Sequence, residues 1–201
     1  DYGVGNLFSL VCSLEKIGAD AVVTADAERI LAADSVILPG VGAFGDAADR
    51  LRALRLDGAL NDFAASGKPL MGVCLGMQLL FDESLEYGRH KGLSLLPGVV
   101  APLEKDLPRG AKVPHMGWNS LDFERPDDPL LRRIAPGAHV YYVHSYYATA
   151  CEGVVSASSD YLGARVPGIV RRGNVCSAQF HPEKSGAVGL SILRSFVDGI
   201  K

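Results

Sequence analysis

The sequence predicts an α/β protein built on an open, mixed and mostly parallel sheet flanked by helices, with antiparallel strands in its C-terminal half. Helical and strand-like segments alternate from residue 6 to residue 73, which implies parallel strands joined by right-handed helical crossovers. After about Gly92 the pattern changes to short β-prone runs, and two of the last runs flank Gly173-Asn174, a pair that suits a tight hairpin turn. We expect one domain over residues 1–201.

The first elements follow from periodicity and capping. Apolar residues recur at helical spacing over residues 6–17, and Gly18 is placed to end that helix. Residues 21–23 form a short apolar run that predicts a strand, and Asp26 is suited to cap a brief helix. The chain opens at Asp1 with DYGVGN, a strand-to-helix turn without its strand. We therefore expect the first strand of the fold to be missing from the N-terminus.

Two further strands are expected to end beside each other. A strand over residues 35–38 runs into PGVG, helical segments fill residues 44–66 up to Gly67, and a strand over residues 70–73 leads into Cys74. In such sheets, ligands bind outside the carboxyl ends of the strands. Because PGVG and Cys74 both follow strand ends, we expect them to face one crevice.

The C-terminal half is expected to hold short strands, mostly antiparallel, and one closing helix. The predicted strands cover residues 99–103, 119–123, 139–147, 154–157, 169–172 and 175–180. The closing helix carries Leu190, Leu193, Val197 and Ile200 on one face.

Composition excludes several classes of function. The formal net charge is -3 and the basic residues are scattered, so we expect no nucleic-acid partner. The four cysteines show no C-x-x-C pair, which argues against a zinc site, and we expect reduced thiols in a cytoplasmic protein. No apolar stretch is long enough to span a membrane. No metal or other cofactor is expected, because G-x-G in the opening turn lacks the rest of a dinucleotide fingerprint.

Cys74 has the spacing of a nucleophile elbow. It stands in GVCLG, where Gly72 and Gly76 relieve crowding at a sharp turn between a strand and a helix. The backbone N–H of Leu75 would then point at an oxyanion formed on an attacked carbonyl. Free cysteine is also a common buried hydrophobe. The elbow spacing alone leaves the two interpretations about equally open.

His181 and Glu183 are the best candidates for a base and its orienting group. They stand two residues apart in FHPEKS, after a predicted strand. Pro182 fixes its own φ and favours extended backbone before it, so both side chains are expected on the same side. A carboxylate could then hold one ring nitrogen while the other faces a thiol. Taken alone, the HPE motif is better interpreted as a surface turn whose histidine has its hydrogen bonds satisfied. Considered together with the cysteine elbow, the catalytic interpretation becomes more favoured.

The PGVG segment offers backbone N–H groups. Glycine and proline after a strand usually mark only a loop. At a strand end beside the crevice, however, glycines let the backbone approach a ligand. The segment could therefore supply the second donor of an oxyanion hole.

These motifs together resemble a known family. GVCLGMQLLF around Cys74 and FHPEKS around His181 and Glu183 are similar to the two signatures of class I glutamine amidotransferases, whose fold is flavodoxin-like. The segments DYGVGN, PGVGAFGD, KGLSLLPG, VPHMGWN and VHSYYA further resemble one branch, the glutaminase subunits of imidazole glycerol phosphate synthase in histidine biosynthesis. The resemblance covers nearly the whole chain and departs from the family only in the missing first strand.

The resemblance implies a reaction. Cys74 would attack the side-chain amide of L-glutamine, His181 would pass a proton to departing ammonia, and Glu183 would orient His181. Water would then hydrolyse the thioester to glutamate. By motif position, the backbone N–H groups of Val41 or Gly42 and of Leu75 would form the oxyanion hole. The residues implied to bind the substrate are Gly40, Gln78, Ser145 and Tyr146.

The resemblance also implies a partner, a (β/α)₈ barrel cyclase that receives the ammonia through a channel and makes imidazole glycerol phosphate and aminoimidazole carboxamide ribotide. The expected assembly is a heterodimer in which the partner controls the glutaminase. The segment KVPHMGWN is a candidate contact surface, since aromatic residues and methionine are enriched in interface cores. A core strand with a buried indole is about as good an interpretation. The candidate interface residues are Asn6, Pro114, His115, Met116, Trp118 and Lys184.

Three alternatives stay open at this point. The nearest is the glutaminase of a different amidotransferase synthase, which would share the triad but not PGVG and PHMGWN. The second is a cysteine hydrolase that acts alone on peptides or γ-glutamyl compounds. The third is a regulatory subunit without activity, against which the intact Cys74, His181 and Glu183 argue.

Overall fold

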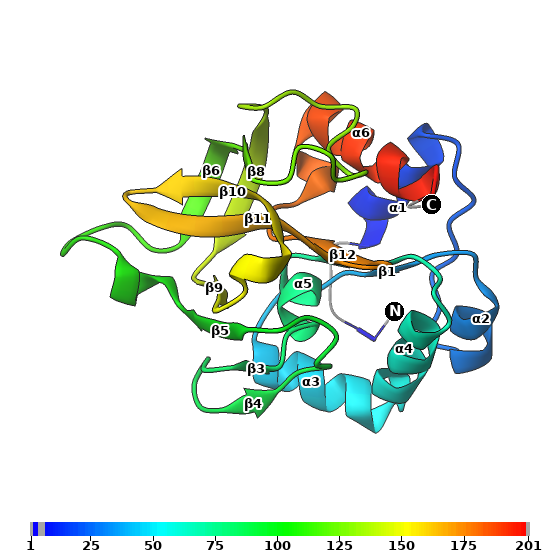
Figure 1. The fold of residues 1–201 in the computed structure, drawn as a ribbon. Helices are drawn as coiled ribbons and strands as arrows, with labels where there is room; N and C mark the ends of the chain where they lie inside the picture. Colours follow the sequence, from blue (N-terminus) through cyan, green and yellow to red (C-terminus); the bar gives the residue numbers. More distant parts are fainter. Residues whose placement is uncertain (1, 4–6, 200–201) are drawn as a thin grey trace.

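The computed structural model describes residues 2–3 and 7–199, and its centre is a six-stranded sheet with helices on both faces (Figure 1). The order of its strands is β1-β2-β12-β11-β10-β7. The α-helices are α1 (Leu7–Lys16), α2 (Ala27–Ala32), α3 (Phe44–Ala53), α4 (Leu56–Ala65), α5 (Leu75–Leu79) and α6 (Gly186–Val197). The six strands of this sheet are β1 (Val36–Leu38), β2 (Leu70–Val73), β7 (Asp122–Phe123), β10 (Val155–Tyr161), β11 (Ala164–Arg172) and β12 (Val175–Ala178).

The parallel part of the sheet is buried on both faces. Strand β2 lies between β1 and β12 and runs parallel to both. Because successive side chains of a strand point to opposite faces, Leu70 packs with Phe44 and Phe63 of α3 and α4, whereas Met71 packs with Ile192 of α6. All four residues of β2 are buried, which is typical of a central parallel strand. The nucleophile elbow therefore follows the most enclosed strand of the fold.

The C-terminal half supplies the antiparallel part. Strands β11 and β12 form a hairpin in which Arg172 pairs with Val175 around Gly173-Asn174, as the sequence predicted. The side-chain amide of Asn174 donates to the carbonyl oxygens of Ala64 and Lys68 at 2.9 and 2.7 Å. This turn thus fixes β12 against the end of α4. Strands β10 and β7 complete the sheet in antiparallel pairing.

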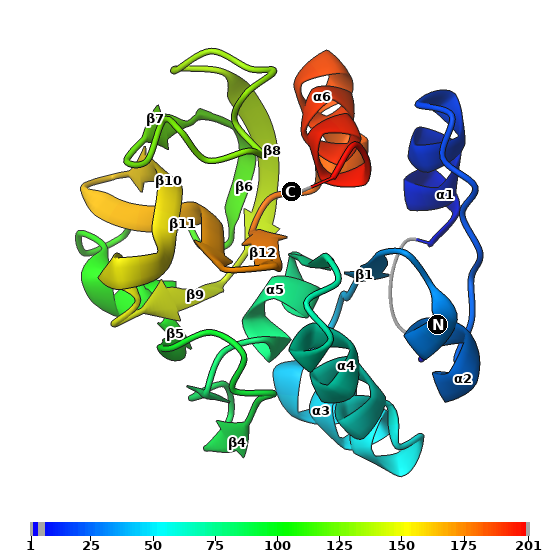
Figure 2. The same cartoon turned by 45° about the vertical axis from the view of Figure 1, so that its right-hand side comes forward.

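Two smaller sheets stand beside the central one, at the β-rich end (Figure 2). One has the order β4-β3-β5-β9 and the other pairs β6 with β8. Their strands are β3 (Glu83–Ser84), β4 (His90–Lys91), β5 (Val99–Pro102), β6 (His115–Ser120), β8 (His139–His144) and β9 (Tyr146–Thr149). The 3₁₀ turns are η1 (Leu103–Asp106), η2 (Glu152–Val154) and η3 (Pro182–Lys184). The mixed α/β class is confirmed. The expectation of a mostly parallel sheet is wrong for the described residues, because only the pairs β1–β2 and β2–β12 of the central sheet are parallel, whereas the C-terminal strands pair antiparallel, with a tight turn joining β11 to β12.

The strand predicted at residues 21–23 is wrong. The segment has no regular structure, and Val22 and Val23 are 56% and 45% exposed. A strand needs a hydrogen-bonded neighbour, and this segment instead borders a cavity of about 730 Å³ between α1 and β1. The neighbouring cap is confirmed, since Asp26 accepts hydrogen bonds from the backbone N–H groups of Glu28 and Arg29.

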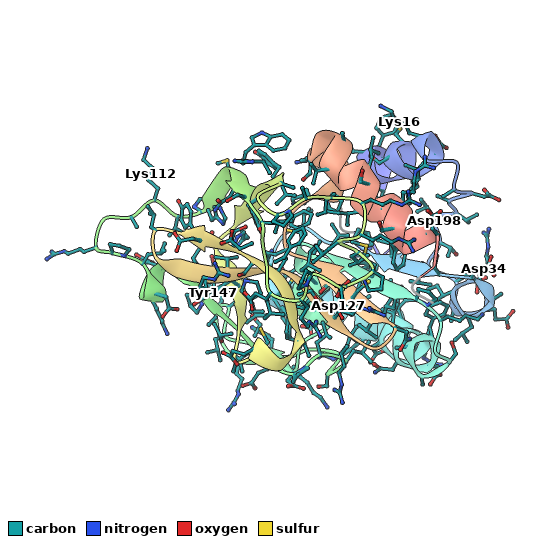
Figure 3. The ribbon with its side chains drawn as sticks, turned by 45° about the horizontal axis from the view of Figure 1, so that its top comes forward. Lys16, Asp34, Lys112, Asp127, Tyr147 and Asp198 are labelled. Carbon is teal, nitrogen blue, oxygen red and sulfur yellow. The ribbon has the colours of Figure 1, made fainter. Side chains whose placement is uncertain are left out.

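The two ends of the molecule differ in character. Figure 3 shows Lys112 on a loop that projects from the β-rich end, with Asp34 at the opposite, helical end. Within the described residues, no helix is long and apolar enough to cross a membrane. Over the same residues, no group of three His, Cys, Asp or Glu side chains could hold a metal ion.

Candidate functional site

Cys74 stands on a strained turn between β2 and α5. Its φ and ψ are 55° and -112°, a region that residues other than glycine rarely adopt and that is often found at active sites. The glycines on either side make the turn possible. A Cβ atom on Gly76 would lie 1.8 Å from the carbonyl oxygen of Leu38, and one on Gly72 would lie 2.7 Å from that of Gly76. The structure therefore has the elbow geometry that the spacing predicted.

The thiol of Cys74 lies in a nearly closed environment. Cys74 is 7% exposed, and its Sγ lies 4.0 Å from the carbonyl oxygen of Val143. The side-chain Nε2 of Gln179 approaches the same sulfur at 3.9 Å. The backbone N–H of Cys74 donates to Ala178 at 2.8 Å, so β12 holds the elbow from the side.

His181 and Glu183 meet as the sequence predicted. The ring Nδ1 of His181 lies 2.8 Å from Oε1 of Glu183, and both side chains are 4% exposed. Pro182 begins the 3₁₀ turn η3 between them. The turn is tied to β8, because the backbone N–H of His181 donates to the carbonyl oxygen of Tyr141 at 2.9 Å. Oε2 of Glu183 has no hydrogen-bond partner among the described residues.

The environment of His181 favours its charged form. Burial alone lowers the pKa of the ring, but hydrogen bonds to Cys74 and Glu183 and the negative charge of both groups outweigh it and raise the pKa to about 9. His181 therefore carries a proton at neutral pH. A protonated imidazole beside a thiol can stabilise a thiolate and later protonate a leaving group.

The PGVG loop lies against the elbow. A Cβ atom on Gly40 would lie 2.9 Å from the backbone nitrogen of Gly76, so only glycine fits there. Gly42 has φ +97°, and both Val41 and Gly42 are exposed. The loop is also fixed by Tyr2, whose buried hydroxyl donates to the carbonyl oxygen of Pro39 at 2.8 Å.

The predicted substrate residues are partly brought together. Gln78 lies on α5, and its Nε2 donates to the carbonyl oxygen of Tyr146 at 2.9 Å. Ser145 and Tyr146 follow β8 and are half-buried. The ring of Tyr146 meets Tyr87 edge to face, with 6.3 Å between centroids. The hydrogen bond from Gln78 thus joins α5 to the first residue of β9.

Sequence reasoning missed two polar groups at this site. Gln179 has an exposed fraction of 0% and contacts both Cys74 and Gln78. Glu86 is a buried carboxylate that accepts the backbone N–H of Phe44, and its charge is one cause of a raised pKa at Tyr146, after burial. Gln179 could have been noticed in AQFHPE, but Glu86 lies in a loop without any periodic signal.

A second group of buried histidines lies beside the site. His144 Nδ1 lies 2.9 Å from the carbonyl oxygen of Tyr146, and its Nε2 lies 2.9 Å from Nδ1 of His115. Because a carbonyl oxygen only accepts, His144 must donate from Nδ1, and His115 must then donate to His144. Nε2 of His115 is left to accept from the side-chain amide of Asn119 at 3.3 Å. Two neutral rings therefore satisfy the whole chain of hydrogen bonds.

The environment of this pair favours the neutral form. Burial lowers the pKa of His115 to about 4. Burial and then the neighbouring His115 lower the pKa of His144 to about 3. The ring of His115 is stacked between Tyr142 and Tyr161, with centroids 4.5 and 4.1 Å away.

The candidate interface residues separate into two groups. Met116 and Trp118 are 60% and 57% exposed, so the alternative interpretation of a buried indole is wrong. His115 is 2% exposed, because alternate residues of β6 face inward, and its side chain cannot be a surface contact. Lys184 is exposed, and its Nζ lies 5.9 Å from the ring centroid of Tyr141, which also meets Trp118. Pro114 is half-buried, and the expectation for Asn6 lies outside the described residues.

Comparison with known proteins agrees with this geometry. The family described as glutamine amidotransferase class-I matches residues 1–199. Imidazole glycerol phosphate synthase subunit HisH of Bacillus cereus (strain G9842) is 50% identical over 196 residues, which cover 98% of this chain and 91% of that protein. The protein of the same name from Halalkalibacterium halodurans is 49% identical over 199 residues, covering 98% and 92%.

Solved structures share the fold at lower identity. A crystal structure of a glutamine amidotransferase superposes with a TM-score of 0.74 at 21% identity, covering 97% of this chain and 94% of that one. PurLQS from Thermotoga maritima superposes with a TM-score of 0.70 at 20% identity, covering 100% and 96%.

Proposed function

The chain belongs to the class I glutamine amidotransferase family, and from this premise we propose that it is the glutaminase subunit of an imidazole glycerol phosphate synthase. The observation that carries the proposal is the arrangement of Cys74, His181 and Glu183, a thiol at a strained elbow beside a histidine held by a carboxylate. The near-full-length identity to subunits of that name supports the choice within the family.

The chemistry follows from the positions of these three groups. The sulfur of Cys74 attacks the side-chain carbonyl carbon of L-glutamine, forming a C–S bond and a tetrahedral oxyanion. Collapse of the oxyanion breaks the C–N bond, and the proton on His181 goes to the nitrogen, which leaves as ammonia. Water then attacks the thioester with His181 as base, giving glutamate and free thiol. Glu183 keeps the ring in the productive orientation.

Backbone groups on two sides of Cys74 suit the oxyanion. The N–H of Leu75 begins α5 directly after the nucleophile. The PGVG loop packs against α5 through Gly40, and Val41 and Gly42 follow Gly40 directly in the chain. We assign the oxyanion hole to Leu75 and to Val41 or Gly42, because two preorganised donors are the usual requirement for acyl transfer.

Polar groups beyond the elbow suit the amino-acid end of glutamine. The side chain of Gln78 donates to Tyr146, the first residue of β9, and Ser145 directly precedes it in the chain. Glu86 adds a buried carboxylate near Tyr146, and a carboxylate is the natural partner of the substrate's α-ammonium group. We therefore assign these residues, with Gly40 closing the pocket behind them, to substrate binding.

The relatives are named as subunits, and we assign the partner as a (β/α)₈ barrel cyclase that takes up the ammonia to make imidazole glycerol phosphate and aminoimidazole carboxamide ribotide. Met116 and Trp118 are exposed, and exposed aromatic and methionine side chains are the composition expected of an interface core. Lys184 of η3 shares the ring of Tyr141 with Trp118 and would lie at the edge of that surface. Pro114 and Asn6 belong to the same assignment.

The four free thiols fit a cytoplasmic location.

One variant tests the nucleophile. Cys74→Ala should abolish glutamine hydrolysis while the complex with the cyclase still uses added ammonia. Glutamate release and imidazole glycerol phosphate formation measure the two activities separately. Cys12→Ala is the matched control, because Cys12 is an exposed free thiol on α1. Glutamate release that survives in Cys74→Ala would contradict the mechanism.

A second experiment tests the partner. The isolated chain should hydrolyse glutamine slowly, and the rate should rise when the cyclase and its ligand are added, since ungated hydrolysis would waste glutamine. Running the assay with cyclases and with other amidotransferase synthases distinguishes this function from that of a different glutaminase. Full activity of the isolated chain would contradict the gating.

A further inference from the structure

The two glutamines of the chain, Gln78 and Gln179, are in contact beside the nucleophile. They come from different elements, α5 and the end of β12, and both are buried. A buried amide without a full set of partners is costly, so two such groups next to a reactive sulfur call for an explanation. Their hydrogen bonds show what each side-chain atom faces.

The orientation of both amides follows from one carbonyl. Tyr146 presents its carbonyl oxygen to Gln78, and a carbonyl only accepts, so the Gln78 atom at 2.9 Å is the donor Nε2. The same Nε2 lies 3.1 Å from Gln179, which must therefore offer its oxygen, Oε1. The remaining end of the Gln179 amide is Nε2, and it lies 3.9 Å from Sγ of Cys74. These hydrogen bonds therefore fix which end of each side-chain amide is the nitrogen and which is the oxygen.

Besides the ring of His181, which favours a thiolate, the sulfur of Cys74 faces a group that disfavours its charge. The carbonyl oxygen of Val143 lies 4.0 Å from Sγ, and a carbonyl dipole directed at a thiolate is repulsive. The Nε2 of Gln179 is a donor on the same sulfur, and hydrogen bonds to charged groups are stronger than those between neutral ones. The backbone holds this donor in place, because Gln179 donates its N–H to Gly168 at 3.0 Å.

We propose that Gln179 is a positioning residue that holds the Cys74 thiolate with its Nε2 and holds the Gln78 side chain in its substrate-binding orientation with its Oε1. The second half of this assignment rests on the proposed function, whereas the first concerns the sulfur alone. The titratable groups that interact with Cys74 are His181, which directly precedes η3, and Tyr2 in the N-terminal segment. Behind His181 lie Glu183 and His144. Gln179 differs from them all in being unable to change charge.

The test measures the reactivity of Cys74 without glutamine. Iodoacetamide alkylation of the whole chain is followed against pH by mass spectrometry of the Cys74 peptide, because alkylation reports the thiolate. The variants are Gln179→Met, which keeps the length and loses the donor, and Gln179→Glu, which keeps the shape and replaces the donor with an acceptor. Ser177→Ala is the matched control, since Ser177 is a buried residue of the same strand whose hydroxyl has no partner among the described residues.

We expect the midpoint of the alkylation profile to move up by about one pH unit in Gln179→Met. Gln179→Glu should move it further, although it is the closer match in shape, and Ser177→Ala should leave it unchanged. In the complex with the cyclase, both Gln179 variants should also lower kcat for glutamine hydrolysis and raise KM.

An unchanged alkylation profile in both Gln179 variants would overturn the proposal, whatever happens to hydrolysis. The same holds if Gln179→Glu alkylates like the unaltered chain while Gln179→Met does not, since that result would make Gln179 a packing residue. If the Gln179 variants shift the alkylation profile as expected but the unaltered chain releases no glutamate with any synthase, the proposed function fails and the role of Gln179 at the sulfur stands.

Discussion

Three buried histidines lie near one another in this protein but differ in charge. His181 is protonated, whereas the pair His115 and His144 is neutral. His181 has a carboxylate and a thiol as neighbours, and its pKa is raised to about 9. His115 and His144 have each other, an amide and a carbonyl, and their pKa values are lowered to about 4 and about 3. Burial lowers the pKa in all three cases, so the partners alone decide which ring is charged.

The two groups therefore affect stability in opposite directions with pH. A pKa raised above that of the unfolded chain gives His181 a stabilising contribution that is complete below about pH 6.5 and is lost as the pH rises through about 9. The lowered pKa values of His115 and His144 give a contribution that is present above about pH 6.5 and is lost as the pH falls toward 4 and 3. A catalytic ring and a structural pair can thus be separated by titration.

The largest expected effect comes from removing the carboxylate that distinguishes the two groups. Glu183→Gln keeps the shape but withdraws the charge from His181, so the ring should lose both its orientation and part of its raised pKa. We expect kcat for glutamine hydrolysis in the complex to fall by roughly 10⁴-fold, as the same acid-to-amide change does in a serine-protease triad. Glu104→Gln, at an exposed glutamate of η1, is the control. Activity within a few-fold of the unaltered chain would show that Glu183 does not orient the base.

The next effect is on stability in mild acid. Protonation of His115 and His144 in the unfolded chain should lower the free energy of unfolding on the order of 4 kcal/mol between pH 7 and pH 5. His115→Phe keeps a ring between Tyr142 and Tyr161 and should remove about half of that pH dependence. At pH 7 the variant should lose about 1 to 2 kcal/mol, because Nε2 of His144 is left without its donor. Urea unfolding at pH 7 and pH 5 measures the free energy of unfolding and its change with pH. An equal change with pH in His115→Phe and in the unaltered chain would contradict the assignment of a neutral pair.

Local patterns were enough to predict much of the fold and the centre of the site. The strand over residues 70–73 and the hairpin at Gly173-Asn174 were predicted because an apolar run and a turn pair are properties of adjacent residues. Cys74 and the HPE turn were found in the same way, since each motif is short and each lies at a strand end. Their meeting in space followed from the topology of parallel strands.

The failures have a common physical cause. The apolar run at residues 21–23 was predicted as a strand, but a strand also needs a neighbour, which periodicity cannot reveal. Gln179 and Glu86 act through contacts with residues far away in the chain, and His115 was placed on the surface although β6 turns its ring inward. Single polar residues carry no local signal of their partners, so only the fold identifies them.

A smaller effect concerns the alkaline limit of activity. Deprotonation of His181 near pH 9 leaves no proton for departing ammonia, so kcat should fall about tenfold for each unit above that pH. In Glu183→Gln the limit should move to lower pH, whereas in His115→Phe it should stay. The pH profile of glutamate release in the complex measures both. A limit that moves in His115→Phe as much as in Glu183→Gln would mean that the two histidine groups titrate together.

The smallest effect is expected at a histidine that belongs to neither group. His139 begins β8, the strand that ends at His144, but it is exposed. His139→Gln should change the free energy of unfolding by less than about 0.5 kcal/mol at pH 7, as surface substitutions usually do. It should also leave unchanged the decrease in the free energy of unfolding between pH 7 and pH 5, which urea unfolding can check. A pH dependence as shallow as that of His115→Phe would show that exposed histidines also cause the acid sensitivity, and that it does not arise from the buried pair alone.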